Sequence, residues 1–149
     1  MGIACGAGLG FLLAVLWFDL MFDVQVRGHR AEVLPAGVRD SIAAYYRRVT
    51  TTAHPMSRLV AVAMLVTLAA LVGEIAHGDV RVWVGDASLL FTAAAIGLAA
   101  IRTVRNAIRL GAQTDTVERQ SVLARSILRD HIACFLAIAV TLMLQVAAA

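Results

Sequence analysis

The chain is short of the residues that build water-soluble domains. Only 15% of its 149 residues are charged, whereas a soluble domain carries about a quarter. It contains no lysine, so all thirteen basic residues are arginine, and it has only two prolines. The shortage of charge argues against an ordinary soluble domain and directs attention to where charge is missing.

Cysteine is also scarce. Cys5 and Cys134 are too few for a disulfide framework, and no CxxC or HExxH metal motif is present. A disulfide needs Cα atoms within about 7 Å of each other. The sequence puts Cys5 near the outer end of the first apolar run and Cys134 near the inner end of the last, so we predict that they form no disulfide.

Four long segments lack any Asp, Glu, Lys or Arg: residues 1–18, 59–73, 87–101 and 132–149. A run of about 20 apolar residues crosses the hydrocarbon, and shorter runs do so with polar residues at their ends. We predict one transmembrane domain over residues 1–149, an all-α integral membrane four-helix bundle of up-down-up-down topology with cytoplasmic helical extensions. The spans are expected at residues 3–22, 56–75, 84–101 and 131–146.

Arginine predicts the orientation. Six arginines lie between spans one and two, six between spans three and four, and only Arg81 between spans two and three. The positive-inside rule then places the first and third loops in the cytoplasm and both termini outside a cell (inner) membrane. Arginine-rich loops that face anionic lipid headgroups explain this basic charge. We expect lipid, and other membrane subunits or a homo-oligomer, as partners, and no nucleic acid.

Three helical segments are expected outside the spans, and the last of them, residues 112–130, leads without a break into span four. Residues 38–53, after the break at Pro35-Ala-Gly37, have an amphipathic pattern. They either lie in the membrane interface, with Tyr45 and Tyr46 at headgroup depth, or extend span two. A second segment continues span three and is expected to end at Gly111.

Polar residues gather at the cytoplasmic ends of the spans. Asp19 and Asp23 share one helix face at i,i+4 spacing. We expect Asp19 to be buried and paired with an arginine of span three or four, and Asp23 to be the more exposed boundary residue. The candidate polar cluster comprises Asp19, Asp23, His54, Arg102, Arg105, Asn106, Arg125, Arg129, Asp130 and His131.

Three interpretations of this cluster are open. The preferred one is a collar of ion pairs that fixes the register of the spans. The second is a metal site, since Asp19, Asp23, His54 and His131 are ligand types suited to iron or zinc. No metal motif accompanies them, so no metal is predicted. In the third, an acid or a histidine beside arginines binds an anionic or quinone-like substrate and moves protons.

Several features carry a family resemblance: Leu34-Pro35 after span one, YYRRVTTTAHPM at residues 45–56, Asn106 after span three, and Arg129 with His131 entering span four. In these the chain resembles the small four-helix membrane proteins of the anthrone-oxygenase-like family. That family's tryptophan before span four and its proline-asparagine pattern after span three are missing. The layout is also similar to that of membrane-embedded bacterial protoporphyrinogen oxidases, whose span-one histidine is missing here.

No catalytic residue or cofactor is predicted. We interpret the chain as an accessory or assembling membrane subunit with a polar arginine/aspartate/histidine cluster. The alternative is a membrane-embedded oxidoreductase or oxygenase acting on a hydrophobic, quinone-like or polycyclic substrate.

Overall fold

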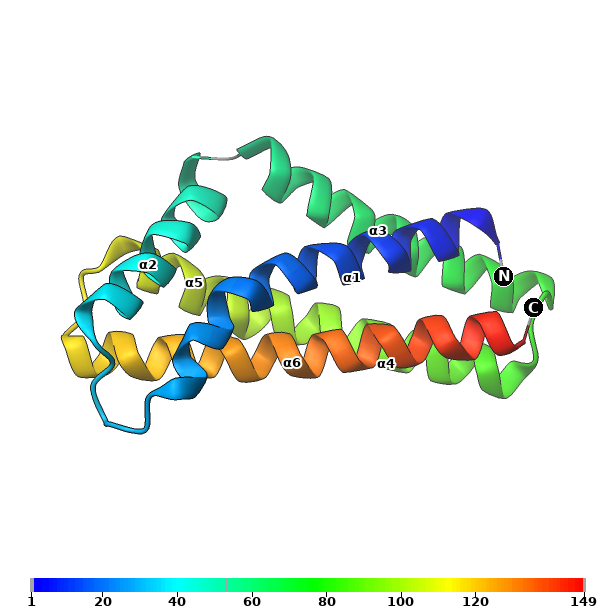
Figure 1. Cartoon of the computed structure of the whole chain (residues 1–149). Helices are drawn as coiled ribbons and strands as arrows, with labels where there is room; N and C mark the ends of the chain where they lie inside the picture. Colours follow the sequence, from blue (N-terminus) through cyan, green and yellow to red (C-terminus); the bar gives the residue numbers. More distant parts are fainter. Residues whose placement is uncertain (1, 53, 149) are drawn as a thin grey trace.

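The computed structural model describes residues 2–52 and 54–148, without the side chain of His54. Four long helices lie side by side and alternate in direction: α1 (Ile3–Asp23), α3 (His54–His77), α4 (Val82–Leu98) and α6 (Val117–Ala147) (Figure 1). No strand occurs in the described part of the chain. The predicted all-α four-helix bundle is confirmed.

Shorter elements extend these helices. A 3₁₀ turn, η1 (Val24–Gly28), continues α1. A wider helical turn, η3 (Ala99–Thr103), joins α4 to α5 (Val104–Ala112). With these extensions, four segments are long and apolar enough to cross a membrane: Ile3–Gly28, Pro55–His77, Val82–Ala112 and Val117–Ala147. Each predicted span lies within one of them.

The two ends of the bundle differ. Both termini and the α3–α4 turn lie at one end, while α2 (Ala36–Arg47), the wide turn η2 (Arg48–Thr52) after it, and the α5–α6 turn lie at the other (Figure 1). We call the latter the α2 end. Cys5 and Cys134 are free and buried in a core between the long helices, and a second core fills the α2 end.

Helix α2 decides between the two alternatives for residues 38–53. It crosses the end of the bundle as a separate helix and packs against α5, so it does not extend span two (Figure 1). Its buried face carries Ile42, Ala43 and Tyr46. The side chain of Tyr46 belongs to the core of the α2 end, and its depth in a membrane stays a prediction.

Gly111 does not end its helix as predicted. Helix α5 runs on to Ala112, and Gln113 takes the left-handed conformation, with φ at 53°. A Cβ atom on Gly111 would lie 2.8 Å from the backbone nitrogen of Arg47. The absence of a side chain therefore allows the backbones of α2 and α5 to touch.

Candidate functional site

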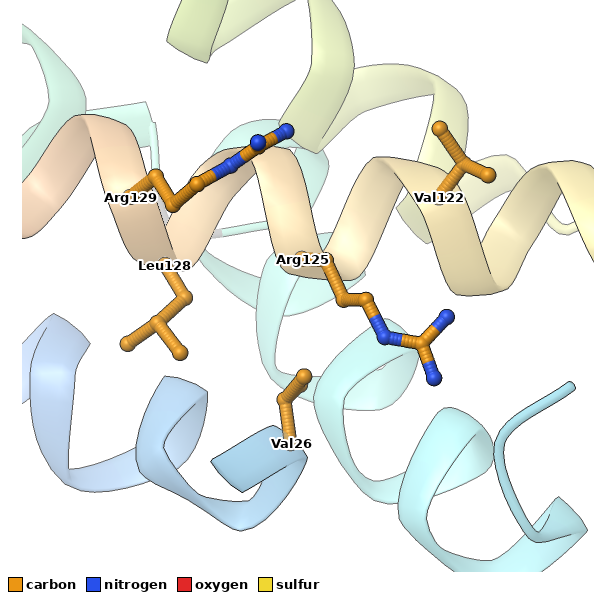
Figure 2. A pocket seen from close by; sticks show the side chains of 5 residues that line it. All are labelled: Val26, Val122, Arg125, Leu128 and Arg129. Carbon is orange, nitrogen blue, oxygen red and sulfur yellow. The ribbon is translucent and has the colours of Figure 1, made fainter. Parts of the chain in front are cut away.

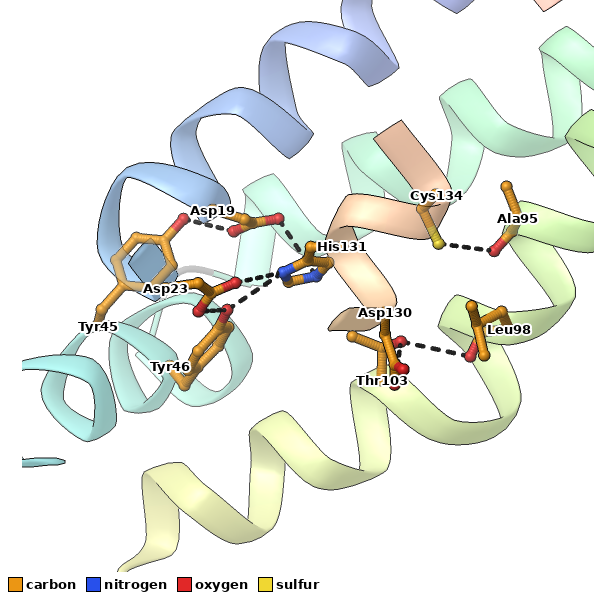
Figure 3. Close-up of polar contacts among 10 residues, drawn as sticks. All are labelled: Asp19, Asp23, Tyr45, Tyr46, Ala95, Leu98, Thr103, Asp130, His131 and Cys134. Carbon is orange, nitrogen blue, oxygen red and sulfur yellow. Dashed lines mark hydrogen bonds and ion pairs between the residues drawn. The ribbon is translucent and has the colours of Figure 1, made fainter. Parts of the chain in front are cut away.

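The last turn of α1 carries the two aspartates to the α2 end. Their i,i+4 spacing puts both carboxylates on one helix face, toward α2 and α6 (Figure 3). The side chain of Asp23 is completely buried, and that of Asp19 is 16% exposed. Both carboxylates therefore need hydrogen-bond partners from within the protein.

His131 of α6 lies between these carboxylates. Its Nδ1 is 2.7 Å from Oδ2 of Asp23, and its Nε2 is 3.8 Å from Oδ2 of Asp19. The contact with Asp23 is a hydrogen bond, and the contact with Asp19 is longer. The ring joins α6 to the end of α1.

Two adjacent tyrosines of α2 complete the arrangement. Tyr46 donates its hydroxyl to Oδ1 of Asp23 at 2.7 Å, and Tyr45 donates to Oδ1 of Asp19 at 2.6 Å. The ring of Tyr45 also stacks on that of Phe22, with centroids 4.0 Å apart. We call Asp19, Asp23, Tyr45, Tyr46 and His131 the Asp–His–Tyr cluster.

The tyrosines remain neutral donors over a wide pH range. Burial, followed by the charge of Asp23, raises the pKa of Tyr46 well above its ordinary value. Burial, followed by the charge of Asp19, raises the pKa of Tyr45 in the same way. A tyrosinate beside a carboxylate would bring two negative charges together with no proton between them.

The predicted roles of the two aspartates are reversed. Asp23 is the buried residue, because η1 continues the chain beyond it and α2 folds back over it. Asp19 is the more exposed one, and its partners are Tyr45 and His131 instead of an arginine. The prediction that Asp19 pairs with an arginine of span three or four is therefore wrong.

A separate ion pair joins η3 to α6. Arg102 donates Nε to Oδ2 of Asp130 at 2.9 Å, and its Nη2 bonds the second carboxylate oxygen. Asp130 is buried, whereas the side chain of Arg102 is half exposed. Thr103 Oγ1 also lies 3.4 Å from Asp130 (Figure 3). A bidentate contact of this kind fixes the orientation of both groups.

The remaining candidates do not join either group. Arg125 donates to the backbone carbonyls of His29, Ala31 and Glu32, and so holds the loop after η1. The Asn106 amide bonds Ser126 at 3.4 Å. Arg105 and Arg129 are exposed, and the side chain of His54 lies outside the described residues. The structure thus divides the ten predicted residues among several places.

Metal-ligand geometry is not found in the part of the chain that the structure describes. No group of three or more His, Cys, Asp or Glu side chains there could hold a metal ion. In the Asp–His–Tyr cluster, both oxygens of Asp23 and Nδ1 of His131 already bond to one another or to Tyr46.

Two hollows flank η1. One is a groove of about 430 Å³ lined by Trp17, Leu20, Met21, Val24, Arg27 and Ile132. The other, of about 390 Å³, is lined by Val26, Val122, Arg125, Leu128 and Arg129 (Figure 2). Neither is lined by a residue of the Asp–His–Tyr cluster.

Comparison with protein-family models, with curated proteins and with solved structures gave no match for this chain. Its function must therefore be inferred from its own residues.

The sequence analysis missed the role of Tyr45 and Tyr46 as partners of the aspartates. One signal for it was present. Two neighbouring tyrosines on a short amphipathic helix each supply a hydroxyl, and a buried hydroxyl requires an acceptor. Asp40 and Glu32 lie nearer to the tyrosines in the sequence than Asp19 and Asp23 do, so this signal does not identify which acid is the acceptor.

Proposed function

We propose that this chain is a multi-pass protein of the cell (inner) membrane that acts as an accessory or assembling subunit. In this proposal the termini lie outside and the α2 end lies in the cytoplasm, because twelve of the thirteen arginines lie in the two loops and helix ends that belong to the α2 end. The main support for the proposal is that the polar groups of the Asp–His–Tyr cluster form hydrogen bonds with one another.

A general acid or base must come within hydrogen-bond reach of its substrate. In the cluster, Asp23 is bonded to both Tyr46 and His131, and Asp19 is bonded to Tyr45. These contacts join α1, α2 and α6 to one another, and both oxygens of the buried Asp23 carboxylate already have partners within the protein. This favours a role in positioning helices, the best attested use of buried polar groups.

The outer faces of the helices offer contact surface for other membrane components. Val62, Leu65 and Val66 form an exposed apolar stripe on α3. Leu136, Val140 and Met143 form another on α6. Such stripes suit lipid chains and the helices of a partner subunit or of a second copy.

Purification from native membranes in mild detergent, followed by native mass spectrometry, tests this function. A subunit is expected to appear in an assembly heavier than one chain. Leu65→Gln, on the α3 stripe, is expected to reduce recovery of that assembly, whereas Val104→Gln, at an exposed apolar position on α5, is expected to leave it unchanged. Recovery of the wild-type protein as a solitary chain would contradict the proposal.

One observation favours the second candidate, an oxidoreductase or oxygenase of a hydrophobic substrate. The groove residues Leu20 and Ile132 directly follow Asp19 and His131 in the sequence. The groove and the cluster therefore lie at the same level of α1 and α6, although no cluster residue lines the groove. A solitary chain that retains a quinone-like or polycyclic molecule in the same mass measurement would support this candidate over the first.

A further inference from the structure

The groove that Trp17 lines has an apolar wall and a single basic residue. Trp17, Leu20, Met21 and Val24 line it at the three- and four-residue spacing that defines one face of a helix. Ile132 of α6 lines it as well. Its volume of about 430 Å³ lies within the range of small-molecule sites, about 300–1,000 Å³.

Arg27 is the only charged residue among those that line the groove. It follows Val24 by three residues, in η1. Among the described residues it has no hydrogen-bond or ion-pair partner, and its side chain is exposed. The site thus combines apolar walls along α1 with one unpaired guanidinium at the end.

The second hollow is a weaker candidate. Figure 2 shows Val26 and Leu128 facing each other there, while the guanidinium groups of Arg125 and Arg129 point apart. Arg125 is already engaged with three backbone carbonyls of the loop after η1. Only Arg129 is left to bind an anion, and this hollow has three apolar lining residues, Val26, Val122 and Leu128, where the groove has five.

We propose that the groove lined by Trp17, Leu20, Met21, Val24, Ile132 and Arg27 binds one anionic phospholipid. The acyl chain lies along the apolar wall, and the headgroup phosphate accepts hydrogen bonds from Arg27. Charge complementarity selects this occupant, because a guanidinium matches phosphate with two parallel donors. The position agrees, since Arg27 stands at the end of an apolar segment long enough to cross a membrane, Ile3–Gly28, where headgroups lie.

Native mass spectrometry of the full chain with defined lipid tests the proposal. The purified protein is titrated in non-ionic detergent with palmitoyl-oleoyl phosphatidylglycerol or with the matching phosphatidylcholine. Arg27→Gln is expected to weaken phosphatidylglycerol binding about fivefold, which corresponds to about 1 kcal/mol for one basic residue near an anionic surface, and to leave phosphatidylcholine binding unchanged.

Arg105→Gln is the matched control, because Arg105 is exposed and lines neither hollow. It removes the same charge and is expected to leave both affinities unchanged. Val24→Trp fills the groove from an exposed position and is expected to weaken binding of both lipids. All variants are first required to melt within a few degrees of the wild type, so that a loss of folding is not scored as a loss of binding.

Equal weakening by Arg27→Gln and Arg105→Gln would overturn the proposal, since general surface charge would then explain the binding. Retention of phosphatidylglycerol by Val24→Trp would overturn it as well. Binding of an uncharged quinone in the groove, equal in the wild type and in Arg27→Gln, would also contradict it. These outcomes are independent of whether the chain assembles with a partner.

Discussion

Nδ1 of His131 lies 2.7 Å from Oδ2 of Asp23, so the middle of α6 is tied to the last residue of α1. Oδ1 of the same aspartate accepts a hydrogen bond from Tyr46 of α2. One buried carboxylate thereby joins α1 and α2 to α6, which lies far from both in the sequence. Tyr46 and His131 also contact each other at 3.4 Å, which closes the network among the same three helices.

Removal of Asp23 is expected to destabilise the protein more than removal of Asp19. Asp23→Ala removes the close partner of both the buried Tyr46 hydroxyl and His131 Nδ1, which keep only their mutual contact at 3.4 Å, and the cost is about 1–3 kcal/mol for each group left unsatisfied. Asp19→Ala leaves chiefly the hydroxyl of Tyr45, which is only partly buried and can bond to water. Thermal unfolding in detergent should show the larger decrease in Tm for Asp23→Ala. Equal decreases would show that the two carboxylates are equivalent.

Alkaline titration reports directly on the cluster, because Tyr45 and Tyr46 are the only tyrosines of the chain. Their pKa values are raised in the folded protein, whereas in an unfolded chain both ionise near pH 10. Absorbance at 295 nm should therefore show no ordinary tyrosinate transition near pH 10 while the protein is folded. The Tyr45→Phe variant, which keeps only Tyr46, isolates the signal of the buried residue.

The sign of the linked stability change follows from the same shifts. A folded pKa above the unfolded value contributes stability that is present below about pH 10 and is lost as the pH rises toward the folded values. Stability in detergent should decrease above pH 10 in the wild type and decrease less in Tyr46→Phe. A normal tyrosinate transition near pH 10 in the folded protein would contradict the hydrogen bonds of both hydroxyls to the aspartates of the cluster.

Gly111→Ala tests the close contact of α2 with α5. The added Cβ would lie 2.8 Å from the nitrogen and 3.0 Å from the Cα of Arg47, and these backbone atoms can move only with the helix. We expect a loss of about 1–3 kcal/mol, as for other overpacked sites. Gly97→Ala is the matched control in α4, since its Cβ would meet nothing within 4 Å, and a gain of about 0.5–1 kcal/mol in helix stability is expected there. Equal Tm values for the two variants would refute the contact.

Reporter fusions test the proposed orientation. Both termini lie at one end of the bundle with the α3–α4 turn (Figure 1), so the proposal places Gly78 outside and Gln113 inside. An alkaline phosphatase fusion after Gly78 should be active and one after Gln113 inactive, with the reverse for a cytoplasmic fluorescent reporter. A cytoplasmic signal after Gly78 would overturn the orientation.

The long helices were predictable because their signal is local. The runs without charged residues determine the spans, and each predicted span lies inside one helical segment of the structure. The position of α2 was not predictable in this way. It depends on contacts with residues far away in the sequence, such as Gly111 against Arg47.

The prediction of which aspartate is more exposed was wrong for a related reason. The sequence analysis placed Asp23 at the edge because hydropathy falls there, but a fall in hydropathy does not show whether the chain turns back to cover the residue. Here it does, through η1 and α2. The predicted arginine partner was wrong as well. Arginine is the most frequent polar residue at these helix ends and was therefore the expected partner. In the structure the partners are His131 and two tyrosines.

Hydrogen exchange of α2 tests the central claim that the Asp–His–Tyr cluster holds this helix across the end of the bundle. In the wild type the backbone amides of Ala36–Arg47 should exchange slowly, because the helix is anchored through Tyr45 and Tyr46. In Asp23→Ala they should exchange much faster, while those of α3 and α4 stay protected. Asp86→Ala, at an exposed position of α4, is the matched control and should leave α2 as slow as in the wild type. If α2 remains protected in Asp23→Ala, the cluster does not anchor it and the account is contradicted.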